Sequence, residues 1–153
     1  MRRIKPLPLS HIDEAASIEA ACLGSAWSAE QLADSLGRED FCYLGVFEDD
    51  VLAGICSYYL VADEIQIVNL AVKPEFRRRG IGRALLTYIR FDARIQGCSK
   101  ILLEYEKGNL AAEALYRTEG FRTVGERRGF YNGTNAVLAG DLENADFGFG
   151  KLL

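Results

Sequence analysis

Arginine and glycine residues gather in one short stretch of this 153-residue chain. Four of its 18 basic residues fall within seven positions, in a run that reads Arg77, Arg78, Arg79, Gly80, Ile81, Gly82 and Arg83. Glycine allows positive φ and lets a ligand approach the main chain closely. The unpaired N–H groups that begin a helix carry the positive end of its dipole and bind phosphate well, and arginines supply complementary charge. The run therefore predicts a phosphate or pyrophosphate site.

The alternative interpretation of this run is a solvated turn in front of a helix. Arginines at the positive end of a helix dipole are unfavourable unless an anion is bound, which favours the anion site. Other phosphate-binding motifs fit poorly, because the chain has no GxxxxGK[ST] run and its glycine spacing is not GxGxxG.

The cysteines and the single histidine are spread along the chain, at Cys22, Cys42, Cys56, Cys98 and His11. A zinc site needs clustered Cys and His ligands, so we expect no metal site. A cysteine nucleophile would need His11 as its base, and lone cysteines are more often small buried hydrophobic residues. Thiol chemistry is therefore not expected either.

The composition is that of an ordinary globular protein. Hydrophobic residues make up 49% of the chain, enough for one core, and we expect a single domain over 1–153 with an irregular tail at 143–153. The formal net charge of −4 disfavours nucleic-acid binding, which needs a basic surface. No apolar run approaches the roughly 18 residues of a membrane span, and no signal-peptide core follows the basic start. We therefore expect a cytoplasmic monomer or weak homodimer, with neither membrane nor direct nucleic-acid partner.

Hydrophobic periodicity and turn residues predict seven strands and four helices. The strands are expected at 4–7, 41–47, 51–61, 64–72, 100–105, 121–127 and 136–142. The helices are expected at 11–22, 28–36, 83–96 and 110–118. The order β-α-α-β-β-β-α-β-α-β-β predicts an α/β fold in which a mixed sheet carries helices on both faces.

Polar and glycine residues predict where these elements begin and end. Helix N-caps are expected at Ser10, Ser28 and Asn109, and Ser28 with Gln31 has the capping-box pattern. Turns and helix stops are expected at residues 48–50, Pro74, Gly97 and Gly120.

The R-x-x-G-x-G of Arg77, Gly80 and Gly82, which follows Asn69-Leu70-Ala71-Val72-Lys73-Pro74, resembles the acetyl-CoA pyrophosphate loop of the GNAT acyltransferase superfamily. The predicted order of elements matches the fold of that superfamily. Segments 103–106, 109–112, 114–116 and 120–121 are similar to the RimI-type ribosomal-protein-alanine N-acetyltransferases. The resemblance covers nearly the whole chain. It implies a GNAT-like sheet and an acetyl-CoA-dependent enzyme that acetylates a protein N-terminus, the N-terminal alanine of a small-subunit ribosomal protein.

The same resemblance implies which residues bind the cofactor. The main chain of Leu70, Ala71 and Val72 would pair with the pantetheine arm of coenzyme A as an extra strand. The run from Arg77 to Arg83 would hold the pyrophosphate, and Asn109 would contact the cofactor near its reacting end.

Two side chains would carry the proton transfers that the resemblance implies. Glu104 would take a proton from the attacking amine, and Tyr116 would protonate the departing thiolate of coenzyme A. On residue type alone, a glutamate on a strand is as easily an exposed or ion-paired carboxylate, and a tyrosine on a helix is usually part of the core.

The acceptor side is expected to use aromatic residues. Trp27, in the segment Ala26-Trp27-Ser28, and the pair Phe130 and Tyr131 beside a turn resemble the substrate-side segments of the RimI type. The sequence departs from that type directly after Glu104, where Tyr105 and Glu106 replace a small apolar residue and an arginine. These changes bear on the choice of acceptor.

Other functions stay open at this level. An acetyltransferase for a small amine or a protein lysine would use the same chemistry, although an α-amine, with a pKa of about 7.7–8.0, is easier to deprotonate than lysine near 10.4. A non-catalytic acyl-CoA sensor would keep the glycine loop and lose the Glu104 and Tyr116 pair, which this chain retains. An RNA-associated protein is disfavoured by the net negative charge.

Overall fold

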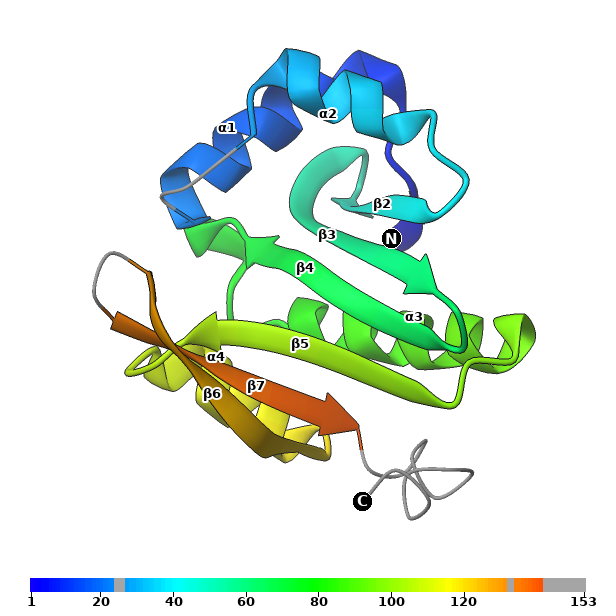
Figure 1. The fold of residues 1–153 in the computed structure, drawn as a ribbon. Helices are drawn as coiled ribbons and strands as arrows, with labels where there is room; N and C mark the ends of the chain where they lie inside the picture. Colours follow the sequence, from blue (N-terminus) through cyan, green and yellow to red (C-terminus); the bar gives the residue numbers. More distant parts are fainter. Residues whose placement is uncertain (24–26, 132–133, 142–153) are drawn as a thin grey trace. The chain divides into compact units, whose positions relative to one another are not determined.

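The computed structural model describes residues 1–23, 27–131 and 134–141, without the side chains of Phe130, Tyr131 and Thr134. Its elements follow the predicted order (Figure 1). The strands are β1 (Arg2–Pro6), β2 (Phe41–Glu48), β3 (Val51–Val61), β4 (Glu64–Val72), β5 (Lys100–Glu106), β6 (Phe121–Tyr131) and β7 (Thr134–Asp141). The helices are α1 (Ile12–Leu23), α2 (Ala29–Leu36), α3 (Ile81–Gln96) and α4 (Leu110–Thr118), with short 3-10 turns at Leu9–His11 and Pro74–Phe76. The expected tail at 143–153 lies outside the described residues.

The described strands form one mixed sheet in the order β1-β2-β3-β4-β5-β7-β6. β4 and β5 run parallel, with Glu64–Ile67 beside Lys100–Leu103, and α3 makes the crossover that a parallel pair needs. The pairs β1–β2, β2–β3, β5–β7 and β6–β7 are antiparallel. The predicted α/β fold with a mixed sheet is confirmed.

The chain divides into two compact units. Unit 1 contains Met1–Leu60 and Val68–Tyr88, and unit 2 contains Val61–Ile67 and the chain from Ile89 onward. β4 and α3 therefore contribute residues to both units.

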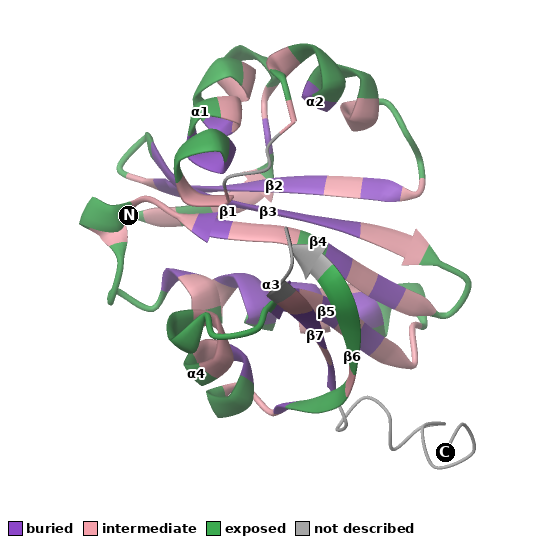
Figure 2. Cartoon of the chain, turned by 60° about the vertical axis from the view of Figure 1, so that its left-hand side comes forward, coloured by how far each residue is buried: buried purple, intermediate pink, exposed green. Residues whose placement is uncertain are grey.

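In unit 1, α1 and α2 pack on one face of β2 and β3, whose residues are mostly buried (Figure 2). The buried cluster there consists of Leu7, Ala15, Ile18, Leu32, Phe41, Tyr43, Phe47, Leu52, Ile55 and Ala71. Gly54, next to Ile55 in β3, faces the other way, since a Cβ atom on it would lie 3.5 Å from the side chain of Ile81 in α3. Because neighbouring strand residues point to opposite faces, unit 1 carries helices on both faces, as predicted.

In unit 2, Arg90 of α3 ties together the ends of α4 and β7. Its Nε donates to the Asp141 carboxylate at 2.7 Å, and its Nη2 donates to the main-chain carbonyl of Glu119. Its guanidinium also lies 5.2 Å from the ring centroid of Phe121. Asp141 is buried, and a buried carboxylate is tolerated only when it is paired in this way. The contacts of Arg90 therefore fix how α3, α4 and the strands of unit 2 are joined.

Local sequence signals predicted several boundaries correctly. Ser28 accepts a hydrogen bond from the Gln31 N–H at 3.2 Å, and the Gln31 side chain accepts from the Ser28 N–H at 2.9 Å, which completes the capping box. Asp49 and Asp50 both have positive φ, as a tight hairpin turn between β2 and β3 requires. Gly97, with φ of +73°, ends α3.

Several boundaries differ from the prediction, and β1, expected at 4–7, spans Arg2–Pro6. α3 begins at Ile81, two residues early, because the Gly80 carbonyl already accepts from the Ala84 N–H at 3.0 Å. β6 continues to Tyr131 and β7 begins at Thr134, because their pairing resumes after an irregular register. Ser10, expected to cap the first helix, lies inside the 3-10 turn Leu9–His11 that leads into α1, and the residue before that turn is Pro8. No helix in the described part of the chain is both long and apolar enough to span a membrane.

Candidate active site

The glycine loop of unit 1 contains two residues with positive φ. Arg78 and Gly80 have φ of +61° and +78°, directly before α3 begins, and positive φ at such positions can gather main-chain N–H groups around an anion. Arg2 of β1 binds main-chain carbonyls of this loop. Its Nη2 donates to the Arg79 carbonyl at 2.8 Å, and its Nη1 lies 3.5 Å from the Gly80 carbonyl. The loop carbonyls are thus bound within the protein, which suits a loop whose N–H groups receive phosphate.

The predicted phosphate-binding residues differ in how their side chains are used. Arg78, Arg79 and Arg83 are exposed. Arg77 is exposed as well, and its Nε donates to the Val72 carbonyl at 3.0 Å. Ile81 is only 2% exposed, so it can contact a cofactor only through its main chain. Gly82 lies in the first turn of α3.

Leu70, Ala71 and Val72 form the end of β4 in unit 1. β3 approaches this segment closely, because a Cβ atom on Gly54 would lie 2.9 Å from the Ala71 carbonyl oxygen. The register that pairs β4 with β5 ends at Ile67, before this segment begins. The segment is thus held from the β3 side.

Glu104 lies in β5 of unit 2 and is half-buried. Its carboxylate accepts a hydrogen bond from Nη2 of Arg127 in β6 at 2.7 Å. Both residues pair with β7, Glu104 with Leu138 and Arg127 with Ala136, so they lie on the same face of the three-stranded segment. A cation therefore sits directly beside the candidate base.

Tyr116 of α4 is buried in unit 2 and is only 7% exposed. Its ring packs against Tyr105 of β5 and Phe121 of β6, at centroid distances of 5.7 and 5.9 Å. Because Tyr105 and Glu104 are neighbours in a strand, their side chains point to opposite faces. Tyr116 and Glu104 thus lie on opposite faces of β5.

The remaining predicted residues lie in different places. The side chain of Asn109 caps α4 by accepting from the Ala112 N–H at 3.1 Å, which confirms the predicted cap and leaves its amide nitrogen for other partners. Trp27 is half-buried and packs on Phe41 in unit 1, with a centroid distance of 5.4 Å. The side chains of Phe130 and Tyr131 lie outside the described residues.

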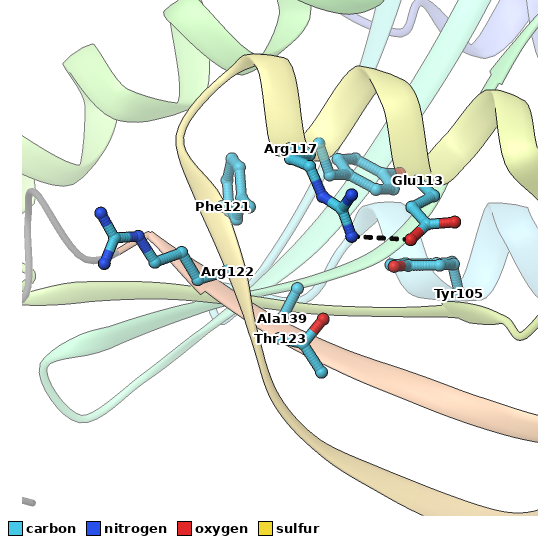
Figure 3. Close-up of a pocket in the computed structure, with 8 residues that line it drawn as sticks. Tyr105, Glu113, Arg117, Phe121, Arg122, Thr123 and Ala139 are labelled. Atoms are coloured by element: carbon cyan, nitrogen blue, oxygen red, sulfur yellow. Dashed lines mark hydrogen bonds and ion pairs between the residues drawn. The ribbon is translucent and has the colours of Figure 1, made fainter.

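A pocket of about 290 Å³ lies in unit 2, between α4 and the strands (Figure 3). It is lined by Tyr105, Glu113, Tyr116, Arg117, Phe121, Arg122, Thr123 and Ala139. Glu113 and Arg117 form an ion pair of 2.8 Å at its rim. Burial raises the pKa of the Tyr105 phenol above its usual value. Tyr105, where the sequence departs from the RimI type, lines this pocket together with Tyr116.

Sequence reasoning missed two side chains of the candidate site. Arg2 reaches the glycine loop from 77 positions away, and Arg127 reaches Glu104 from 23 positions away. In the sequence, Arg2 belongs to the basic start of the chain and Arg127 to the pair Arg127-Arg128. Neither feature shows which distant residue the arginine contacts. Within the described residues, no group of three or more His, Cys, Asp or Glu side chains could hold a metal ion.

A comparison with protein families places these features in a known class. The model of the Acetyltransferase (GNAT) family matches residues 12–121, which is more than half of the chain. The chain belongs to this family. It is an N-acetyltransferase, and enzymes of this family use acetyl-CoA.

Individual relatives support the more specific resemblance to the RimI type. The [ribosomal protein bS18]-alanine N-acetyltransferase of Salmonella typhimurium is 33% identical over 131 residues, covering 86% of this chain and 88% of the relative. The crystal structure of the ribosomal-protein-S18-alanine N-acetyltransferase from Escherichia coli superposes with a TM-score of 0.82 at 28% identity, covering 92% of each chain. Arabidopsis thaliana NAA60 in complex with acetyl-CoA superposes with a TM-score of 0.81 at 18% identity, covering 92% of this chain and 97% of that one. At that identity the likeness concerns the fold alone.

Proposed function

We propose that this protein transfers the acetyl group of acetyl-CoA to the N-terminal alanine of ribosomal protein bS18. The relatives that match most of the chain are named for that reaction. We also propose that both units act together as one cytoplasmic acetyltransferase domain over 1–153, since the family match draws on residues of each unit.

The observation that carries the proposal is the glycine loop. Positive φ at Arg78 and Gly80, together with exposed arginines and the start of α3, fits the pyrophosphate of coenzyme A. Arg2 strengthens this fit because it binds carbonyls that would otherwise repel an anion. In this proposal Arg77 holds the Val72 carbonyl by its hydrogen bond. The phosphates are contacted by Arg78, by Arg79 and by the main chain from Gly80 to Arg83.

The rest of the cofactor would bind along main chain and at the start of α4. Leu70, Ala71 and Val72 would receive the pantetheine arm by β-augmentation. This assignment fits a segment that β3 holds on one side and that lies beyond the register with β5. The free amide nitrogen of Asn109 would contact the cofactor from α4.

Acetyl-CoA, when bound, supplies a thioester whose carbonyl carbon is open to attack by an amine. Glu104 takes the proton that the amine nitrogen loses as the nitrogen–carbon bond forms. Tyr116 gives its phenolic proton to the sulfur as the carbon–sulfur bond breaks. Arg127 keeps the Glu104 carboxylate in one orientation, and on the opposite face of β5 the Tyr105 ring packs against Tyr116.

The proposal is tested by mass spectrometry of a competition reaction. One peptide begins with the N-terminal sequence of bS18, a second has a blocked N-terminus and a lysine, and a third acceptor is a small primary amine. We expect acetylation on the α-amine of the first peptide. Acetylation confined to lysine or to the small amine would contradict the acceptor assignment, and binding of acetyl-CoA without any turnover would indicate a sensor.

The acceptor side provides a further prediction. Trp27, Phe130 and Tyr131 are proposed to form the walls of a peptide site, with the Tyr131 hydroxyl bound to the peptide main chain. Tyr131→Ala should then raise the KM for the peptide much more than the KM for acetyl-CoA. Steady-state kinetics with the peptide and with a small amine check this, and an equal effect on both acceptors would favour the small-amine activity.

A further inference from the structure

α1 contains a carboxylate that the proposed reaction does not use. Glu19 is 0% exposed, inside unit 1. One carboxylate oxygen accepts a hydrogen bond from Nδ2 of Asn69 in β4 at 2.8 Å, and the other accepts from the Tyr43 hydroxyl in β2. Burying a carboxylate is costly unless its oxygens are hydrogen-bonded, as both are here. Glu19 therefore joins three elements at one point.

The place of this contact along β4 is informative. Asn69 directly precedes Leu70, the first residue of the segment proposed to bind pantetheine. One turn along α1 from Glu19, Cys22 lies 3.8 Å from the carbonyl of Val72, the last residue of that segment. α1 thus contacts β4 on each side of Leu70 and Ala71, at positions three residues apart on both elements.

We propose that Glu19 is a positioning residue for acetyl-CoA, acting through its hydrogen bond to Asn69. That bond sets the path of the β4 main chain where it leaves Ile67 and enters the cofactor segment. Main-chain groups pair with a ligand only when their spacing matches it, so a shift of β4 at Asn69 would lower cofactor affinity. This inference rests on the proposed function, because it assigns an acetyl-CoA contact to Leu70–Val72.

If Glu19 had a purely structural role, it would make the same hydrogen bonds, and their loss would not change the affinity for the cofactor. The two donors of Glu19 separate these roles, since Tyr43 connects it to β2 and only Asn69 connects it to the cofactor segment. Tyr43→Phe removes the first bond and leaves the second, and Asn69→Ala does the reverse. Asn69 is only half-buried, so Asn69→Ala should fold.

The experiment measures coenzyme A binding by calorimetry, the KM for acetyl-CoA, kcat and thermal stability for four variants of the full chain. Asn69→Ala and Glu19→Ala should weaken coenzyme A binding about tenfold or more, because the β4 main chain is then no longer held in the path that the cofactor needs. The KM for acetyl-CoA should rise with much less change in kcat, because Glu104 and Tyr116 are untouched. Glu19→Gln retains an oxygen for Asn69 and should restore most of the affinity. Tyr43→Phe should lower thermal stability while leaving affinity close to that of the unmodified protein.

Two results would overturn this inference while the proposed function stands: unchanged affinity in Asn69→Ala, or an equal loss of affinity in Tyr43→Phe. If the unmodified protein does not bind coenzyme A, the proposed function itself is wrong and this inference is withdrawn with it. If Glu19→Ala does not fold, the comparison of Asn69→Ala with Tyr43→Phe still decides.

Discussion

Glu104 and Glu106 are two residues apart in β5 and point to the same face of the sheet, yet their surroundings differ. Glu104 is half-buried and accepts from Arg127, whereas Glu106 is exposed. A base must be held at a fixed place beside the attacking amine, and the contact with Arg127 supplies that restraint at Glu104 alone. The pair of glutamates therefore offers a test with a built-in control.

Glu104→Gln should lower kcat by about a hundredfold or more, because glutamine keeps the hydrogen bond to Arg127 and cannot take a proton. Coenzyme A affinity should stay the same, since Glu104 is not assigned to cofactor binding. Glu106→Gln removes the same charge two residues away and should change kcat little. Steady-state kinetics and calorimetry measure both quantities, and equal rates for the two variants would show that Glu104 is not the base.

Glu19 also makes folding stability depend on pH. Desolvation raises the pKa of this buried carboxyl above its ordinary value of 4.5, while the hydrogen bonds from Tyr43 and Asn69 oppose that rise. The folded state therefore binds the Glu19 proton more tightly than the unfolded state does. The stability that this proton provides is fully present below the unfolded pKa and is lost as pH rises through the folded pKa.

Glu19→Gln cannot titrate, so its unfolding free energy relative to the unmodified protein should increase as pH rises from 4.5 through the folded pKa of Glu19. Above that pKa the difference should become constant. Urea unfolding of both proteins between about pH 4 and pH 8 measures this difference across the titration range of a carboxyl with a raised pKa. A difference that falls with pH would show that the hydrogen bonds outweigh desolvation.

At the scale of secondary structure, short-range signals were sufficient for most elements. The capping box at Ser28, the acidic turn between β2 and β3 and the glycine after α3 each act within a few residues, so the sequence shows them directly. Contacts between distant segments were not predictable in the same way. Arg2 at the glycine loop, Arg127 beside Glu104 and Glu19 beside Asn69 depend on how the strands are ordered. The residue type alone shows that a buried polar or charged side chain needs a hydrogen-bond partner. It does not show which distant residue is that partner.

The capping box predicts a measurable effect on stability. Ser28→Ala removes the oxygen that accepts from the Gln31 N–H and should destabilise the protein by about 1 kcal/mol. Ser35 is a suitable control on the same helix, because its hydroxyl donates to the Gln31 carbonyl inside the helix and caps nothing. Urea unfolding should show a smaller loss for Ser35→Ala. Equal losses in the two variants would mean that the box contributes no more than an ordinary helical hydrogen bond.

At the scale of the whole molecule, the net charge of the chain and the charge of the glycine loop have opposite signs. The chain carries a formal net charge of −4, while the glycine loop concentrates four arginines within seven positions. Coenzyme A is an anion, so the protein as a whole repels it and the loop attracts it. Charges further apart than the Debye length, about 8 Å at physiological ionic strength, are largely screened, and contacts at shorter range persist. The loop should therefore dominate binding at ordinary salt concentrations.

Salt titration of coenzyme A binding separates these two contributions. Affinity should fall as salt rises from about 0.05 M to 0.5 M, because added ions screen the attraction between arginine and phosphate. The double variant Arg78→Gln and Arg79→Gln removes two exposed charges and keeps an unbranched polar side chain at each position. It should bind more weakly at low salt, and its affinity should change less with salt, since repulsion from the acidic remainder is screened as well. Calorimetry at four salt concentrations measures both slopes. Parallel slopes for the two proteins would mean that Arg78 and Arg79 do not contact phosphate, and that the main chain from Gly80 to Arg83 holds the pyrophosphate alone.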